Sequence, residues 1–136
     1  MKKTKILVPL DATERSTHSI NWIKKHFNKN DIEITLMNVR AVIAAEDILA
    51  PVNIWDMKEE SKLVLDEAAV ELEGYTVEKF AVFGHASDQI LKKAEQGNYD
   101  MIIMTKSTKK GISRAIGSVT SKVIHNTKTV VIVLPE

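Results

Sequence analysis

Short apolar runs alternate with segments of helical periodicity along this chain of 136 residues, and this alternation limits the fold more than any other feature. The apolar or alternating runs lie at residues 5–9, 34–39, 76–82, 101–104 and 130–134. Between them, apolar side chains recur at the spacing of an amphipathic helix over residues 14–28, about 58–73, around 90–94 and around 116–123. Apolar strands that are separated by helices indicate a parallel sheet covered on both faces.

The expected fold is therefore α/β, a single doubly wound five-stranded parallel sheet with helices on both faces. A chain of this length predicts one domain, which we place at residues 1–136. Asp11 or Thr13 is expected to cap the first helix. Gly74 and Gly97 are expected to end the second and third helices.

Charge and cysteine content exclude several classes of protein. The formal charge is +1, from 19 Lys and Arg against 18 Asp and Glu, which argues against a dedicated nucleic-acid binder. The absence of cysteine excludes disulfides, thiol catalysis and cysteine-ligated metal sites. No apolar run approaches the roughly 18 residues of a membrane span, and the apolar part of residues 1–10 is too short for a signal peptide. We expect a cytoplasmic protein without a membrane or nucleic-acid partner.

Residues 40–57 do not match this pattern. They are rich in apolar side chains, contain Pro51 and show no clean period. A loop so long and apolar is seldom idle in a compact domain. We expect it to serve as an interface or as a lid.

Ligands of such a sheet bind beyond the carboxyl ends of the strands, where the strand order reverses. The loops expected there cover residues 10–13, 40–55, 83–87 and 105–116. Asp11 follows the first strand directly and could accept hydrogen bonds from a ligand or cap the next helix. Both interpretations stay open from the sequence.

The loop at 105–116 carries four basic residues and no acidic one, and Gly117 and Ser118 follow it. Backbone amides at the start of a helix favour an anion, and Gly117 permits a phosphate to approach closely. The alternative is a solvated basic loop with Ser118 as the helix N-cap. The coincidence of basic side chains and a Gly-Ser helix start at this sheet edge favours an anion site.

The motifs of several enzyme classes are missing. The phosphate loop GxxxxGKS/T, the dinucleotide motif GxGxxG and the nucleophile elbow GxSxG do not occur. No two of the four histidines have the spacing of a helical metal site, and of these only His85 falls in a loop at the ligand edge. The acids of residues 59–67 are expected to form a solvated helix face. We therefore expect no catalytic residues, no metal ligands and no enzyme activity.

Several segments together resemble the universal stress protein family. The segments are Lys5-Ile-Leu-Val-Pro-Leu-Asp11, Gly84-His-Ala-Ser-Asp-Gln-Ile90, Gly117-Ser-Val-Thr-Ser-Lys-Val-Ile-His125 and Thr129-Val-Val-Ile-Val-Leu-Pro135. Only residues 40–57 lack a convincing match. The resemblance implies a UspA-like domain of the adenine nucleotide alpha hydrolase type, usually dimeric. Many members bind ATP, and a second group does not.

The resemblance also implies a binding site. Gly117 and Ser118 match the end of the family's ATP-binding pattern, whereas Thr105 and Thr108 stand where its first two glycines would be. Asp11 and Val39 match positions that contact ribose and adenine. The residues expected to contact a nucleotide are Pro9, Leu10, Asp11, Val39, Met104, Thr105, Thr108, Gly117, Ser118 and Val119.

The two threonines alter the turn that would hold the phosphates. Glycine permits positive φ and close approach of the backbone, which a β-branched residue does not easily permit. Eight residues separate Thr108 from Gly117, one fewer than in the family pattern. Weak or absent ATP binding is therefore expected. The basic side chains of Lys106, Lys109, Lys110 and Arg114 argue the other way, and ATP with magnesium stays a possible ligand.

Two functions are consistent with these features. The first is a non-enzymatic, dimeric stress-response protein without tightly bound nucleotide. The second is an adenine-nucleotide switch with residues 40–57 as a lid. An adenylyl-transferring or pyrophosphatase enzyme ranks lower, because residues 11–15 contain neither a histidine pair nor a glycine-rich loop.

A homodimer is expected through the last strand. Its residues are apolar on both faces, and at the edge of a sheet they would present unpaired backbone groups. They are Val130, Val131, Ile132, Val133 and Leu134.

Overall fold

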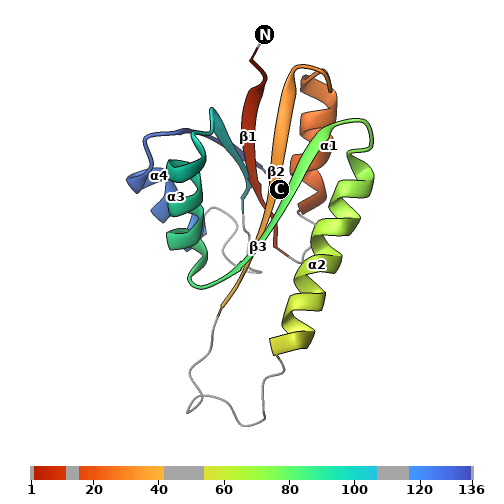
Figure 1. Ribbon diagram of the computed structural model, residues 1–136. Helices are drawn as coiled ribbons and strands as arrows, with labels where there is room; N and C mark the ends of the chain where they lie inside the picture. Colours follow the sequence, from red (N-terminus) through yellow and green to blue (C-terminus); the bar gives the residue numbers. More distant parts are fainter. Residues whose placement is uncertain (1, 12–15, 42–53, 107–116, 136) are drawn as a thin grey trace, which may run out of the picture.

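The computed structural model describes residues 2–11, 16–41, 54–106 and 117–135 (Figure 1). Strands and helices alternate along these residues. The strands are β1 (Thr4–Pro9), β2 (Ile32–Arg40), β3 (Thr76–Phe83), β4 (Met101–Thr105) and β5 (Val130–Leu134). The helices are α1 (Ser16–His26), α2 (Ile54–Glu71), α3 (Ala86–Gly97) and α4 (Ser118–Asn126).

The expected α/β fold is confirmed. The five strands form one parallel sheet in the order β3-β2-β1-β4-β5. β2 and β3 lie on one side of β1, whereas β4 and β5 lie on the other, so the strand order reverses between β1 and β4. In Figure 1 the carboxyl ends of β1 and β2 and the first turn of α2 lie at the lower end of the molecule.

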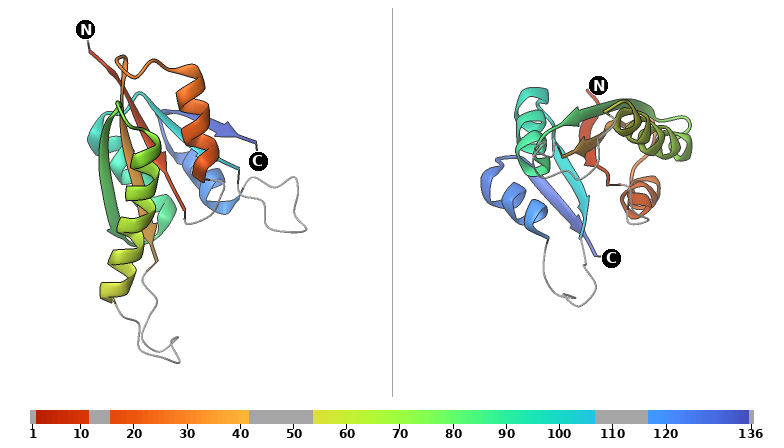
Figure 2. Two further views of the ribbon diagram at one scale, coloured as in Figure 1. Left: turned by 90° about the vertical axis from the view of Figure 1, so that its right-hand side faces the viewer. Right: turned by 90° about the horizontal axis from the view of Figure 1, so that it is seen from below.

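Helices cover both faces of the sheet. Figure 2 shows α1 and α2 on one face and α3 and α4 on the other. Successive residues of β1 point to opposite faces, so Ile6 and Val8 pack under α1 and α2 while Leu7 packs under α3 and α4. All three are fully buried. This double burial explains why the strand reads as a continuous apolar run.

α2 begins earlier than the sequence indicates. It starts at Ile54, about one turn before the expected start near residue 58, and it includes Trp55 and Met57. Met57, Ser61 and Leu65 follow one another at i, i+4 and i+8, and each is at least partly buried. In the sequence, the helical period of residues 54–57 is hidden because they continue the aperiodic apolar segment 40–53. Residues 42–53, for which a lid or interface was expected, lie outside the described part.

The third helix ends at Gly97, as the sequence predicts. Gly97 is the last residue of the helix, and the following Asn98 has the positive φ of 51°. A Cβ on Gly97 would lie 2.2 Å from Cε2 of Tyr99. Gly97 is therefore required for space beside a buried ring. Gly74 has a φ of 90° and lies in the turn after α2, as expected.

Tyr99 fastens the amino end of the sheet. Its hydroxyl donates a 2.7 Å hydrogen bond to Oγ1 of Thr35, and Nζ of Lys5 lies 4.9 Å from its ring centroid. The same lysine donates to the carbonyl oxygen of Gly97 at 2.6 Å. Burial raises the pKa of the Tyr99 hydroxyl, against a smaller opposing effect of the hydrogen bond with Thr35.

Within the described residues no helix is long and apolar enough to cross a bilayer.

The raised pKa of Tyr99 should make the stability difference between the wild type and Tyr99→Phe depend on pH. The unfolded phenol ionises near pH 10, whereas the folded one holds its proton to higher pH, so the folded state loses stability as pH rises above about 10. Near pH 7 the wild type should be more stable than Tyr99→Phe by about 1 kcal/mol, from the lost hydrogen bond. This advantage should shrink in urea unfolding above pH 10. An advantage that stays constant up to pH 11 would contradict the assignment.

Candidate functional site

The carboxyl edge of the sheet gathers the predicted site residues. Asp11 follows the end of β1, Val39 lies near the end of β2, and Thr105 ends β4. Gly117 directly precedes α4. Because the strands are parallel, their carboxyl ends meet at one edge, on both sides of the point where the strand order reverses. Thr108 and the basic residues of 109–114 lie outside the described part of the chain.

The exit of β1 is held firmly. Pro9 pairs with Met37 of β2. The amide of Leu10 donates to the carbonyl oxygen of Met37 at 2.7 Å, and its own carbonyl oxygen accepts from Nδ2 of Asn38 at 2.8 Å. The Leu10 side chain is buried, and the next residue, Asp11, is exposed. The chain therefore passes from the core to the surface within one residue, which presents Asp11 at the edge.

Three predicted site residues share one apolar cluster. Val39 of β2 and Val119 of α4 are partly buried against a cluster that includes Met104 of β4 and Leu7 of β1. Met104 is 6% exposed, so its side chain serves packing more than ligand contact. Val39 and Val119 are each partly exposed on the α3 and α4 side of the sheet.

The exit of β4 is fixed from two directions. Oγ1 of Thr105 lies 2.9 Å from Oγ of Ser19, which is almost completely buried on α1. The amide of Lys106 donates to the carbonyl oxygen of Leu134 in β5 at 2.7 Å. Thr105 has no positive φ, since Asn98 is the one non-glycine residue of the described chain that does. The chain thus leaves β4 in an ordinary conformation, with the threonine hydroxyl engaged by α1.

The start of α4 contradicts the alternative in which Ser118 is the helix N-cap. Ser118 is the first residue of the helix, and the N-cap is Gly117, with φ of −53° and ψ of 156°. Gly117 has no side chain that could cap this end, and no capping side-chain hydrogen bond is found among the described residues. Ser118 is exposed, and Gly117 is partly exposed. A glycine N-cap leaves the first backbone amides of the helix without a capping side chain, an arrangement that suits an anion.

Other candidate groups have structural roles. His85 is the N-cap of α3 without a side-chain hydrogen bond. Asp88 of that helix pairs with Lys122 of α4 at 2.8 Å, and this hydrogen bond lowers the pKa of the Asp88 carboxyl. In the parts of the chain that the structure describes, no three His, Cys, Asp or Glu side chains lie close enough to hold a metal ion.

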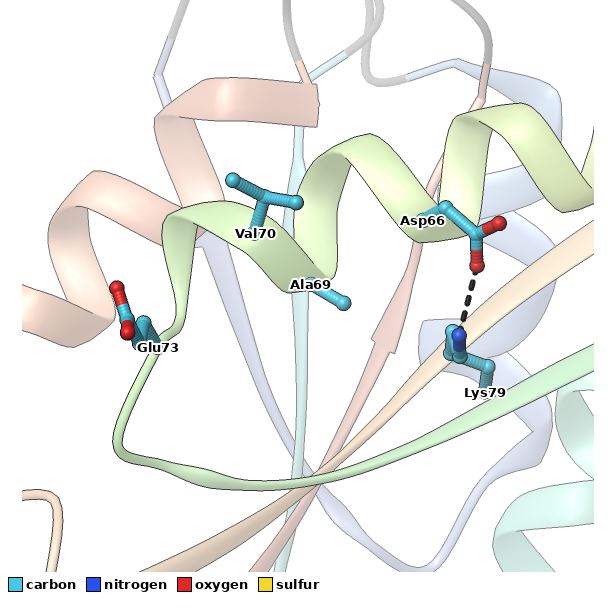
Figure 3. A pocket seen from close by; sticks show the side chains of 5 residues that line it. All are labelled: Asp66, Ala69, Val70, Glu73 and Lys79. Carbon is cyan, nitrogen blue, oxygen red and sulfur yellow. Dashed lines mark hydrogen bonds and ion pairs between the residues drawn. The ribbon is translucent and has the colours of Figure 1, made fainter.

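A surface hollow lies away from this edge. Figure 3 shows it between α2 and the edge strand β3. Its lining is formed by Asp66, Ala69, Val70, Glu73 and Lys79. Lys79 donates to Oδ1 of Asp66 at 2.7 Å and lowers the pKa of that carboxyl. Two of the α2 acids that were expected to be merely solvated are therefore paired, since Glu60 also binds Arg40.

Sequence reasoning missed three buried polar residues behind the site. They are Ser19, Asn38 and Ser61, each no more than 2% exposed. Asn38 gave a signal, because it is a polar side chain near the carboxyl end of a strand that is otherwise mostly apolar. Ser19 and Ser61 gave none, since a serine in an amphipathic helix usually lies on its solvated face.

A family comparison identifies this arrangement. The model of the universal stress protein family matches residues 3–135. The chain belongs to the universal stress protein family. No protein of curated function matches the sequence.

Solved universal stress proteins and their relatives have the same fold. Hypothetical protein MJ0577 aligns with a TM-score of 0.80 and 26% identity over 100% of this chain and 98% of its own. A universal stress protein in complex with cAMP aligns at 0.74 and 14% identity, covering 99% and 98%. A family member from Arabidopsis thaliana with AMP bound aligns at 0.73 and 18%, covering 98% and 92%. At 14% and 18% identity, the structures with cAMP and AMP show a shared fold only.

The link between Ser19 and Thr105 should be measurable as a coupling energy. Ser19→Ala and Thr105→Val each remove one hydroxyl of the pair, and each should lower the free energy of unfolding by about 1 kcal/mol. The double variant should lose less than the sum, by about 0.5–1 kcal/mol, because the second change removes a bond already broken. Urea unfolding of the four proteins measures this cycle. Strictly additive losses would show that the two hydroxyls do not interact.

Proposed function

We propose that this universal stress protein binds an adenine nucleotide at the carboxyl edge of its sheet and prefers a nucleoside monophosphate to ATP. The observation that supports the proposal is a difference between the two parts of the site: the residues for adenosine match the family pattern, whereas the segment for the phosphates does not. Asp11 and Val39, which are expected to contact adenosine, lie at this edge of the sheet. Thr105, the last residue of β4, has its hydroxyl bonded to Ser19 of α1.

The adenosine half is supported by residue types and placement. Asp11 is exposed directly after β1, where its carboxylate can accept hydrogen bonds from ribose hydroxyls. Val39 offers a partly buried aliphatic surface near the end of β2, against which a planar base can pack. Both residues lie at the side of the sheet where ligands of doubly wound folds bind.

The phosphate half supports a short phosphate chain. The backbone amides at the start of α4, whose N-cap is a glycine, can receive one phosphate group, and Gly117 permits its close approach. A triphosphate would also need bare backbone along the turn that leaves β4. Forcing a β-branched residue into the positive φ of such a turn costs about 1–3 kcal/mol, and Thr105 has no positive φ. The relatives that carry AMP and cAMP bind ligands with a single phosphate.

We also propose that the bound nucleotide acts as a signal and is not turned over. No nucleophile and base pair is found among the site residues that the structure describes. Magnesium would matter chiefly for a polyphosphate, whose charge it neutralises. The expected role is therefore a non-enzymatic stress-response protein whose ligand changes its surface.

Titration calorimetry with AMP and with ATP and magnesium tests the preference. We expect AMP to bind at least about tenfold more tightly, which corresponds to about 1.4 kcal/mol. Gly117→Val should abolish AMP binding, because the φ of −53° accommodates valine while its side chain blocks the phosphate. Gly117→Ala should weaken binding less and serves as the graded control. Tighter binding of ATP, or unchanged AMP binding by Gly117→Val, would overturn the proposal.

We further propose that the protein dimerises through β5. The sheet has two edge strands, β3 and β5. β3 carries the exposed charges Glu78 and Lys79 at mid-strand, and such charges oppose edge-to-edge pairing. β5 has no polar residue, and Val130 is 62% exposed. The uncharged edge is the one that favours a second copy.

Sedimentation velocity tests this interface. The wild type should sediment as a dimer at micromolar concentration, and Val130→Lys should shift it toward the 15.2 kDa monomer, because a charge would be desolvated in the interface. Val70→Lys is the matched control. Val70 is 73% exposed on α2, away from β5, so this change should leave the dimer intact. A monomeric wild type, or equal effects of both variants, would contradict the assignment.

A further inference from the structure

We infer that Asn38 is a positioning residue of the nucleotide site, which fixes the peptide that joins Leu10 to Asp11. The inference rests on the proposed function and adds a residue that the family resemblance does not supply. Asn38 itself is 2% exposed, so it touches no ligand. Its effect is exerted through the backbone of β1.

The side-chain amide of Asn38 forms hydrogen bonds with two elements, the exit of β1 and helix α2. Nδ2 donates to the carbonyl oxygen of Leu10 at 2.8 Å, and Oδ1 accepts from Oγ of Ser61 at 2.6 Å. Ser61 is also 2% exposed and lies on the buried side of α2. The serine therefore orients the amide, and the amide orients the carbonyl at the exit of β1.

The geometry of the peptide bond carries this orientation to Asp11. A trans peptide is planar, so the carbonyl of Leu10 and the amide of Asp11 point in opposite directions. Because the carbonyl is held toward Asn38, the direction of the Asp11 amide and the position of the Asp11 Cα are set as well. The amide of Leu10 is fixed independently by the carbonyl oxygen of Met37.

Packing alone does not explain a buried amide at this position. An aliphatic side chain of similar size would suit the neighbouring apolar residues, among them Leu36 on the same face of β2. It would also leave the Leu10 carbonyl without this donor, and a buried polar group without a partner is costly. In the described part of the chain no buried side-chain nitrogen or oxygen lacks a partner. The amide of Asn38 thus supplies a hydrogen bond to the backbone of Leu10 that an aliphatic side chain could not supply.

The test compares Asn38→Leu with Thr35→Val. Thr35 lies on the same strand, is 4% exposed and accepts the hydrogen bond of Tyr99, but it is near the amino end. Asn38→Leu loses two buried hydrogen bonds and Thr35→Val loses one, so both should lower the melting temperature, Asn38→Leu by more. Only Asn38→Leu should weaken AMP binding, by about tenfold, because a misplaced contact group loses its ligand interactions. Thr35→Val should bind AMP within about twofold of the wild type.

A second readout does not need the nucleotide. In amide nuclear magnetic resonance spectra of the ligand-free protein, the Asp11 signal should move in Asn38→Leu and stay in place in Thr35→Val. Ser61→Ala should move it less and weaken AMP binding by about threefold, since the amide keeps its bond to Leu10 but loses its orientation. Ser61→Ala carries the same test if Asn38→Leu does not fold.

The outcomes separate this inference from the proposed function. Equal losses of AMP affinity in Asn38→Leu and Thr35→Val would overturn the positioning role, as would an unmoved Asp11 signal. A wild type that binds no AMP would refute the proposed function. In that case the Asp11 signal alone decides whether Asn38 sets the peptide.

Discussion

The rest of the fold depends on β1, which pairs with a strand on each side and is buried on both faces. β1 bonds to β2 on one side and to β4 on the other, and its residues Ile6, Leu7 and Val8 are inaccessible to solvent. Removing this strand would separate the sheet into two parts. The carboxyl end of β1 is therefore among the best-fixed points of the fold, and the site begins one residue beyond it. Residues at the carboxyl edge of the sheet are held rigidly where they directly follow such a strand.

Two buried polar contacts extend that rigidity past the ends of the strands. Asn38 holds Leu10 at the exit of β1, and Ser19 contacts Thr105 at the exit of β4. These exits flank the point where the strand order reverses. Each contact involves one of the helices α1 and α2, since Ser19 belongs to α1 and Ser61 of α2 donates a hydrogen bond to Asn38 of β2. The same pair of helices that closes the core thus also sets the backbone at the candidate site.

The site itself combines a retained half with an altered half. Asp11 and Val39 supply polar and apolar groups suited to adenosine, and Gly117 leaves the start of α4 without a capping side chain. Thr105 stands at a position where the family pattern has glycine, and its conformation is ordinary. The proposed preference for a monophosphate follows from this division, because the nucleoside and the phosphate chain would contact different segments of backbone.

The amino-acid sequence determined the fold class, the order of the elements and the edge at which the site lies. Apolar runs that alternate with helical periodicity permit few other folds, and parallel strands place their carboxyl ends together. The sequence also indicated Asp11, Val39 and Gly117, since their types and positions match a family pattern. Tertiary structure alone decided the partners of Asn38, Ser19 and Tyr99, which lie far away along the chain. It also decided that Gly97 is needed for space beside a ring and that Ser118 is not the cap of α4. Hydrogen bonds between distant residues depend on how helices pack against the sheet, and no local pattern encodes that packing.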